Sequence, residues 1–360
     1  MTPSDANLRG AKSAAGPRCF IVAEAGVNHN GSIELALRLV EAAASSGADG
    51  VKFQSFSASK VVTAGTGTLA YQKETTGDTD QMEMLRRLEL PRSWLPTLIE
   101  RAIRLGIEFL STPFDQESAD DLVSAGMRCI KIPSGELTNH PFIEYLAGKG
   151  LPVILSTGMS TLDEVAEAVD LIRRRQAPIG IDNSIRPALT LLHCTSNYPT
   201  DPADVNLRAM ITLRDAFAAP VGYSDHTEGV TVSVAAAALG ACLIEKHLTL
   251  DRGMPGPDHK ASIEPAEFAE LVRQIRIVEL SLGSGVKVPQ PSEIPVRQVI
   301  RRSIVAARNL GEGDTIEQAD VAILRPSGGI EPRHLQKVLG ATAKRQIQAG
   351  EIITWNDISP

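Results

Sequence analysis

The stretch GYSDHTEGVTVSVAAAALGACLIEKHLTLDRGMPGPDHKAS, residues 222–262, decides the fold and carries the first candidate chemistry. Its pattern predicts a strand, an Ala-rich helix, a second strand at 241–244 and a polar loop. His226 follows the first strand and His247 follows the second, so we expect two imidazoles at the same end of neighbouring parallel strands. Two neutral imidazoles with open coordination positions favour a Lewis-acid metal over a closed structural site. The alternative is that both rings only hydrogen-bond their neighbours.

Composition limits the classes of protein to which the chain can belong. Its 360 residues suffice for one large domain and a small one, and a net charge of −7 without a basic patch argues against nucleic acid. No apolar run is long enough to span a bilayer, and residues 1–17 lack the apolar segment of a secretory signal. We expect 1–17 to be a disordered extension. The four cysteines form no C-x-x-C pair, which predicts buried, reduced thiols and a cytoplasmic protein.

Short β-rich runs alternate with amphipathic helices from residue 19 onward. The predicted strands are 19–25, 50–53, 107–110, 129–132, 153–155, 189–193, 221–223 and 241–244. Eight such β–α units are typical of the α/β class and of a (β/α)8 TIM barrel in particular. A doubly wound open sheet is the alternative, but residues 26–31 lack the spacing of a glycine-rich phosphate turn.

The rest of the chain divides around this barrel, which we assign to residues 18–285. Residues 286–296 contain three prolines and predict a semi-rigid linker. Residues 297–360 have short β runs and repeat the pattern G-[DE]-x-I-x3-D at 313–320 and 350–357, which predicts a small pseudo-symmetric β-rich domain.

An insertion at 57–90 follows the second strand and is too long for an ordinary β–α loop. It has a polar middle at 72–80 and a predicted short helix at 81–88. Loops of this length usually cover an active site, and an outer-surface decoration is the alternative.

Polar side chains recur at the carboxyl ends of the predicted strands, where barrel enzymes place their catalytic groups. The candidates are Glu24, Lys52, Gln54, Thr112, Lys131, Ser134, Glu136, Ser156, Ser196, Tyr198, Ser224, His226, His247 and, in the last loop, Asp258. Buried lysines and carboxylates are costly unless they are paired or used, so their recurrence predicts a functional mouth.

These residue types suggest a reaction class. Lysines with several hydroxyls describe a site for a phosphate and a carboxylate. Separate carboxylates can hold sugar hydroxyls or move protons, and the two imidazoles add an electrophile. The implied reaction joins an anionic, phosphorylated nucleophile to a polarised carbonyl. A competing interpretation makes Lys131 the Schiff-base lysine of a metal-free aldolase.

Ten motifs in order connect the chain to a known family. They are IVAEAGVNHNGS, VKFQSF, EFLSTPFD, KIPSGE, ILSTGM, HCTSNYPT, GYSDHT, EKHLTLD, GPDHKAS and RRSIVA. With them the chain resembles the bacterial sialic acid (N-acetylneuraminate) synthases, including their legionaminic acid relatives, from Ile21 to the end. The resemblance implies condensation of phosphoenolpyruvate with an open-chain N-acylmannosamine, with release of phosphate. It also implies that 297–360 is an antifreeze-like (SAF) domain.

The resemblance also implies roles for single residues. A divalent metal, Mn²⁺ or Mg²⁺, would be held by His226 and His247. Phosphoenolpyruvate would be bound by Lys52, Thr112, Lys131, Ser134, Ser156 and Ser224. The sugar would face Glu24, Gln54, Glu136, Tyr198 and Asp258, and Glu24, Lys131, Glu136 and Asp258 are the catalytic candidates. One departure is Ser196, where some relatives carry an asparagine that helps to bind phosphoenolpyruvate.

Three functions follow as expectations. The first is an N-acetylneuraminate synthase acting on N-acetylmannosamine, with N,N'-diacetyllegionaminate synthase on 2,4-diacetamido-2,4,6-trideoxymannose as the alternative. A pyruvate-dependent Schiff-base aldolase is more distant, and an ice-binding tail on an inert barrel is a third class. The family resemblance further implies a domain-swapped homodimer in which Arg301, or else Arg302, reaches the partner's sugar site.

Overall fold

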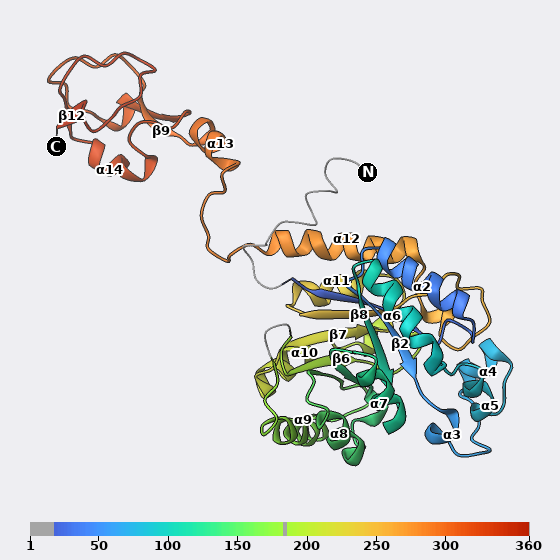
Figure 1. The fold of residues 1–360 in the computed structure, drawn as a ribbon. Coiled ribbons are helices and arrows are strands. Elements are labelled where there is room, and N and C mark those ends of the chain that lie inside the picture. The colour runs from blue at the N-terminus through green and yellow to red at the C-terminus, as the bar shows by residue number, and fades with distance from the viewer. Residues whose placement is uncertain (1–17, 183–185, 360) are drawn as a thin grey trace. The chain divides into compact units, whose positions relative to one another are not determined.

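The computed structural model describes residues 18–182 and 186–359, so the extension predicted at 1–17 lies outside the described residues. The described chain forms two compact units, one ending at Ser284 and the other beginning at Gly285 (Figure 1). Among the helices described, none is long and apolar enough to cross a membrane. All four cysteines are free, as predicted. Cys19, Cys129 and Cys194 are buried, as predicted, whereas Cys242 is only half-buried.

Eight parallel strands make up a single sheet in the first unit. They are β1 (Phe20–Gly26), β2 (Gly50–Ser55), β3 (Glu108–Pro113), β4 (Ile130–Ile132), β5 (Val153–Ser156), β6 (Leu189–Cys194), β7 (Val221–Asp225) and β8 (Leu243–His247). Hydrogen-bonded neighbours follow the order β3-β2-β1-β8-β7-β6-β5-β4, and β3 and β4 lie beside each other, so the sheet curls into a barrel. The predicted (β/α)8 architecture is confirmed, although β2, β3, β7 and β8 continue for two or three residues past their predicted ends.

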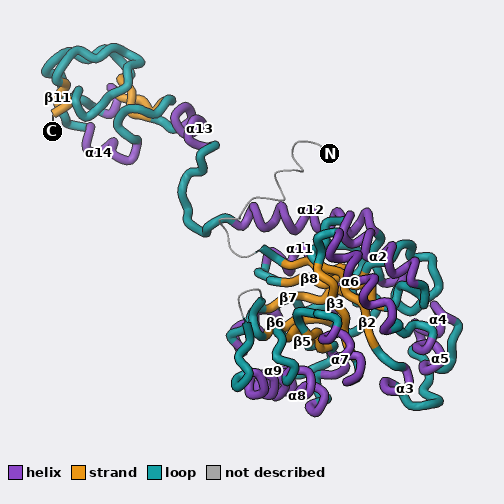
Figure 2. The backbone as a smooth tube through the Cα atoms, in the orientation of Figure 1, coloured by secondary structure: helices purple, strands orange, loops and turns teal. Residues whose placement is uncertain are grey.

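Helices surround this sheet on its outer face, as Figure 2 shows. They are α2 (Ile33–Ser45), α6 (Leu95–Arg104), α7 (Gln116–Ser124), α8 (His140–Ala147), α9 (Leu162–Gln176), α10 (Ala209–Phe217), α11 (Thr231–Ala238) and α12 (Pro265–Leu282). The predicted cap of α2 is confirmed, because Ser32 Oγ accepts the Leu35 N–H at 3.2 Å. The apolar faces of the helices and the outward residues of the strands share one continuous core.

Side chains inside the barrel form two layers because they alternate along each strand. The lower layer is apolar and includes Val22, Leu110, Ile154, Leu192 and Leu243. Two residues further along the same strands, the upper layer holds Glu24, Thr112, Ser156, Cys194 and Glu245. The strands that pack the core therefore also carry polar groups to its carboxyl end.

The insertion after β2 contains three short helices, which lie beyond the end of that strand in Figure 1. They are α3 (Ala58–Val61), α4 (Ala70–Thr76) and α5 (Gln81–Arg86). The predicted helix is present as α5, where Asp80 accepts the Met82 N–H at 2.8 Å, but the polar middle forms α4, which the sequence did not indicate. A small apolar cluster around Met84 and Leu88 fastens α5 to the loops that follow β1, β2 and β3.

The second unit has its own small core and two short antiparallel sheets. β9 (Ser303–Ala306) pairs with β10 (Val321–Leu324), and β11 (Thr342–Ala343) pairs with β12 (Ile358–Ser359). Two further helices are α13 (Glu293–Ile300), which begins inside the predicted linker, and α14 (Leu335–Val338).

The repeated sequence pattern of the second unit has a structural counterpart. Arg308 Nε donates to Asp320 at 2.6 Å, and Arg345 Nε donates to Asp357 at 2.7 Å. The two aspartates are the last residues of the two repeats, so each repeat is closed by the same kind of ion pair.

Candidate active site

A cavity of about 460 Å³ lies at the carboxyl ends of the barrel strands and brings most of the predicted site together. Its lining includes Glu24, Lys52, Gln54, Thr112, Lys131, Ser134, Ser156, Ser196, Tyr198, Ser224, His226, His247 and Asp258. Glu136 is not part of this lining, and its carboxylate instead accepts a hydrogen bond from the Asn139 side chain at 2.7 Å. Arg301 belongs to the second unit.

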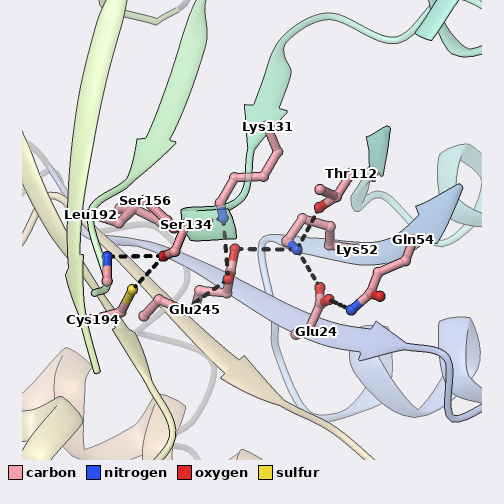
Figure 3. Close-up of polar contacts among 12 residues, drawn as sticks. Glu24, Lys52, Gln54, Thr112, Lys131, Ser134, Ser156, Leu192, Cys194 and Glu245 are labelled. Carbon is pink, nitrogen blue, oxygen red and sulfur yellow. Dashed lines mark hydrogen bonds and ion pairs between the residues drawn. The ribbon is translucent and has the colours of Figure 1, made fainter. Parts of the chain in front are cut away.

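Two lysines and two glutamates form the charged centre of the cavity, shown in Figure 3. Lys52 Nζ lies 2.7 Å from Glu24 Oε2 and 3.5 Å from Glu245 Oε2, and it donates to Thr112 Oγ1 at 2.9 Å. Lys131 Nζ lies 3.7 Å from Glu245 Oε1, so that carboxylate stands between both ammonium groups. We call Glu24, Lys52, Lys131 and Glu245 the mouth centre.

Burial shapes the ionisation of this centre. It raises the pKa of Glu24 to about 7, although the Lys52 ammonium beside it acts in the opposite direction. Burial would also raise the pKa of Glu245, but Lys131 and Lys52 together lower it to about 2. Burial lowers the pKa of Lys131 from its ordinary value. At neutral pH Glu245 is therefore ionised, whereas Glu24 is close to its own titration point.

Serine hydroxyls line the neighbouring part of the cavity, above β4 and β5. Lys131 Nζ donates to Ser156 Oγ at 2.7 Å, and the Gly158 N–H donates to Ser134 Oγ at 2.9 Å. A Cβ at Gly158 would stand 2.4 Å from Ser196 Oγ, so only glycine allows this close approach. The result is a compact group of cation and hydroxyl donors, which suits phosphate or carboxylate oxygens.

The two predicted histidines meet on the β7–β8 side of the cavity. Their ring centroids are 5.5 Å apart, and the Tyr198 ring lies 4.1 Å from His226 and 5.6 Å from His247. His226 Nδ1 lies 2.6 Å from the Thr195 carbonyl oxygen and must donate to it, which leaves Nε2 of that ring unprotonated. Because burial lowers the pKa of His226, the ring is neutral and can act as a ligand.

His247 has an unusual environment for a buried ring. Burial and the nearby His226 lower its pKa well below the usual range, and its Nδ1 is buried without a hydrogen-bond partner. The nearest carboxylate oxygen is Asp258 Oδ2 at 3.9 Å. Burial raises the pKa of Asp258 to about 6. The sequence prediction that the two rings converge beside a lysine-lined cavity agrees with this geometry.

The donor set fits a divalent ion that would complete its coordination with water or substrate oxygens. Within residues 18–182 and 186–359, no group of three or more His, Cys, Asp or Glu side chains is arranged to hold a metal. The two neutral imidazoles, one with a buried nitrogen that has no hydrogen-bond partner, can supply two ligands and leave the other positions to water or substrate.

Sequence reasoning missed several residues that line the cavity. Glu245 was visible only as one of three polar residues ending β8, and nothing in the pattern distinguished it as the partner of both lysines. Gln72 and the apolar side chains of the insertion also reach the lining. Their only signal was the length of the insertion, which favoured a role at the mouth.

Fold and site together define a class: a TIM-barrel enzyme whose mouth is equipped for an anionic substrate and for a carbonyl next to paired imidazoles. Comparisons with known proteins narrow that class. Residues 39–287 match the NeuB family, and residues 301–359 match the SAF domain. The chain therefore belongs to the NeuB family and is an enzyme of the sialic acid synthase type, as the motifs predicted.

Individual relatives cover nearly the whole chain. The N,N'-diacetyllegionaminic acid synthase of Legionella pneumophila is 48% identical over 94% of this chain and 94% of its own. That of Campylobacter jejuni is 44% identical over 93% of this chain and 99% of its own. The crystal structure of an N-acetylneuraminic acid synthetase from Leptospira borgpetersenii is 34% identical with a TM-score of 0.68, covering 78% of this chain and 90% of that one.

Proposed function

We propose that the protein is an N,N'-diacetyllegionaminate synthase, which condenses phosphoenolpyruvate with open-chain 2,4-diacetamido-2,4,6-trideoxymannose. The observation that carries the reaction type is one cavity in which the mouth centre and its serine donors adjoin two neutral imidazoles. The choice of sugar rests on identities of 48% and 44% to legionaminic acid synthases, against 34% to the sialic acid synthetase. The sequence alone favoured N-acetylmannosamine as the substrate, and we now place its alternative, the diacetamido sugar, first.

Phosphoenolpyruvate would bind between β2 and β5. Lys52 and Lys131 are held by carboxylates in the free protein, and an entering dianion can take over part of their pairing. Ser134 and Ser156 offer hydroxyls beside Lys131, and Thr112 already contacts Lys52. Ser196 and Ser224 also line the cavity. Ser196 stands where some relatives carry an asparagine, so a shorter hydroxyl donor takes the place of that amide.

The sugar aldehyde would lie at the imidazoles. His226 and His247 would hold a divalent ion, Mn²⁺ or Mg²⁺, whose contribution is Lewis-acid polarisation of that aldehyde. Tyr198 packs against both rings, and Gln54 donates to Glu24 at 3.2 Å, so these two side chains orient the site from opposite sides.

The bond changes balance without a redox partner. C3 of phosphoenolpyruvate bonds to the aldehyde carbon, whose oxygen takes up a proton, while water adds at C2. Cleavage of the C2–O bond then releases inorganic phosphate and leaves a 2-keto acid. Glu24 and Asp258, whose pKa values burial raises to about 7 and about 6, can exchange these protons near neutral pH. A role for Glu136 in proton transfer stays a prediction, because Glu136 does not line the cavity.

We also propose a domain-swapped homodimer in which Arg301 of the partner subunit completes the sugar site, with Arg302 as the alternative. Support comes from the family resemblance and from the exposure of both arginines, which line a cavity of about 570 Å³ within the second unit. Arg301→Ala is expected to lower activity while the barrel stays folded. Unchanged sugar kinetics in that variant would remove the swapped arginine from the proposal.

Phosphate release by the purified full-length protein tests the reaction. Release is expected only when phosphoenolpyruvate, the diacetamido sugar and a divalent metal are all present, with N-acetylmannosamine a poorer substrate. Full activity after exhaustive chelation would refute the metal role. Borohydride trapping of pyruvate on Lys131 would instead support the Schiff-base aldolase.

A further inference from the structure

One sector of the cavity differs from the rest because it is apolar. Its residues come from the insertion and from the ends of β1 and β3, and we call them the apolar wall. They are Val27, Leu69, Met84, Leu85, Leu88 and Phe114. Val27, Met84 and Leu88 are buried in one small cluster, against which Leu85 and Phe114 pack, so the wall is a built part of the fold.

The position of the wall follows from the barrel order. Its supporting loops follow β1, β2 and β3, whereas the serine donors belong to β4 and β5 and the imidazoles to β7 and β8. With phosphoenolpyruvate at the strand ends between β2 and β5 and the aldehyde carbon at His226 and His247, the wall, which lies on the loops beyond the ends of β1, β2 and β3, is left for the distal end of the sugar. An ion pair between Lys260 and Glu74, 2.9 Å apart, links α4 to the loop that carries Asp258 on this side.

Two features of the wall indicate that a ligand covers it. Leu69 has 56% of its surface exposed although it faces the cavity, and Leu85 is only half-buried in the same lining. Gln72, buried at the start of α4, uses its side-chain oxygen to accept the Leu69 N–H at 3.0 Å. This bond fixes the backbone of Leu69 at the start of α4.

We propose that the apolar wall selects the sugar by its C6 substituent, accepting a methyl group and disfavouring a hydroxymethyl group. The inference rests on the proposed function and adds the residues that set its specificity. A methyl group on the wall loses no hydrogen bond with water, whereas a hydroxyl there is desolvated without a partner. Because an apolar surface discriminates only moderately against an added hydroxyl, the expected preference is about tenfold to a hundredfold in kcat/KM.

The test compares two sugars that differ only at C6, namely 2,4-diacetamido-2,4,6-trideoxymannose and its 6-hydroxy counterpart, with the full-length metal-loaded enzyme. Wild-type enzyme should prefer the deoxy sugar by the factor above. Leu85→Gln should reduce this preference at least about fivefold while leaving the KM for phosphoenolpyruvate unchanged. Leu69→Gln should act in the same direction, and because Leu69 is 56% exposed the substitution removes little buried apolar surface.

Leu105→Gln is the matched control, since Leu105 is 42% exposed at the end of α6 and does not line the cavity. It should keep the wild-type ratio. Equal kcat/KM for the two sugars in the wild-type enzyme, or an unchanged ratio in both wall variants, would overturn the inference while the synthase function stands. If neither sugar supports phosphate release, the proposed function fails and the inference fails with it.

Discussion

Two buried groups of lysine and carboxylate lie close together in the barrel, and their surroundings differ. The mouth centre of Glu24, Lys52, Lys131 and Glu245 lines the cavity. The second group, which we call the rear pair, consists of Asp225 and Lys246, 3.0 Å apart with no exposed surface on either side chain. Lys246 stands between Glu245 and His247, so strand alternation turns it away from the cavity and toward the helices.

The rear pair is saturated by fixed partners. Asp225 accepts from Ser233 Oγ at 2.5 Å and from the Thr227 N–H at 2.9 Å, and Lys246 donates to the Thr227 carbonyl at 2.5 Å. In the mouth centre, by contrast, the lysines border open space that a substrate anion can enter. Burial of a charge therefore does not by itself identify a functional site. The distinguishing feature of the mouth centre is open space beside the lysines, where a substrate anion can replace their present partners.

Replacing a mouth lysine should have the largest effect on catalysis. Lys131→Met is expected to lower kcat/KM by at least about a hundredfold to a thousandfold, because it removes a charged donor from the phosphoenolpyruvate site. The fold should persist, since Lys52 and the Ser224 hydroxyl at 2.9 Å still partner Glu245. Steady-state kinetics and thermal melting check this. Near-wild-type kinetics would remove Lys131 from the site.

Replacing the rear lysine should instead affect stability. Lys246→Met leaves the carboxylate of Asp225 buried and unpaired, which typically costs about 3–5 kcal/mol. The double variant Asp225→Asn/Lys246→Met should recover most of that loss, because no buried charge remains. Urea unfolding measures both. A single variant as stable as wild type would show that the pair is not the closed structural element inferred here.

The imidazoles provide the next contrast. His247→Ala should lower Mn²⁺ affinity at least about tenfold in calorimetry, because one of two expected protein ligands is lost. His193→Gln is the control, because this imidazole bonds the Val205 carbonyl at 2.6 Å and does not line the cavity. Equal metal affinity in the His247 variant and the control would discredit the metal site.

A smaller effect concerns a histidine outside the cavity. Burial lowers the pKa of His29 to about 4, so the folded protein keeps the ring neutral while the unfolded chain protonates it below about 6.5. The unfolded state thus binds more protons, and stability should fall by about 1–2 kcal/mol for this group between pH 7 and pH 5. Urea unfolding at both pH values should show that the free energy of unfolding drops less in His29→Asn than in the wild-type protein. An identical drop in both proteins would contradict this.

Much of the site could be predicted because alternation along a strand is local. The sequence places Glu24, Lys52 and Lys131 at strand ends, and the barrel rule then brings them to one mouth. The same local rule explains why β8 presents Glu245 and His247 together. The rule does not say which residues of β8 face inward. The sequence therefore could not show whether Glu245 or Lys246 faces the cavity.

Other features depend on packing that the sequence does not display. Glu136 follows β4 as predicted, yet it lies in a short 3₁₀ turn, where the nearby Asn139 amide provides its partner. The polar stretch of the insertion folds as α4 because Gln72 caps the Leu69 N–H, and its apolar neighbours are ordered by contacts with distant loops. Such tertiary partners override local composition.

Calorimetric titration of phosphoenolpyruvate is the most direct test of the contrast between the mouth centre and the rear pair. The proteins to compare are wild type, Lys131→Met and Ser233→Ala, the last of which removes one hydrogen bond from Asp225 without leaving a charge unpaired. Lys131→Met is expected to lose at least about a hundredfold in affinity, and Ser233→Ala is expected to bind as wild type does. Equal losses in both variants, or none in Lys131→Met, would contradict the contrast between the two groups.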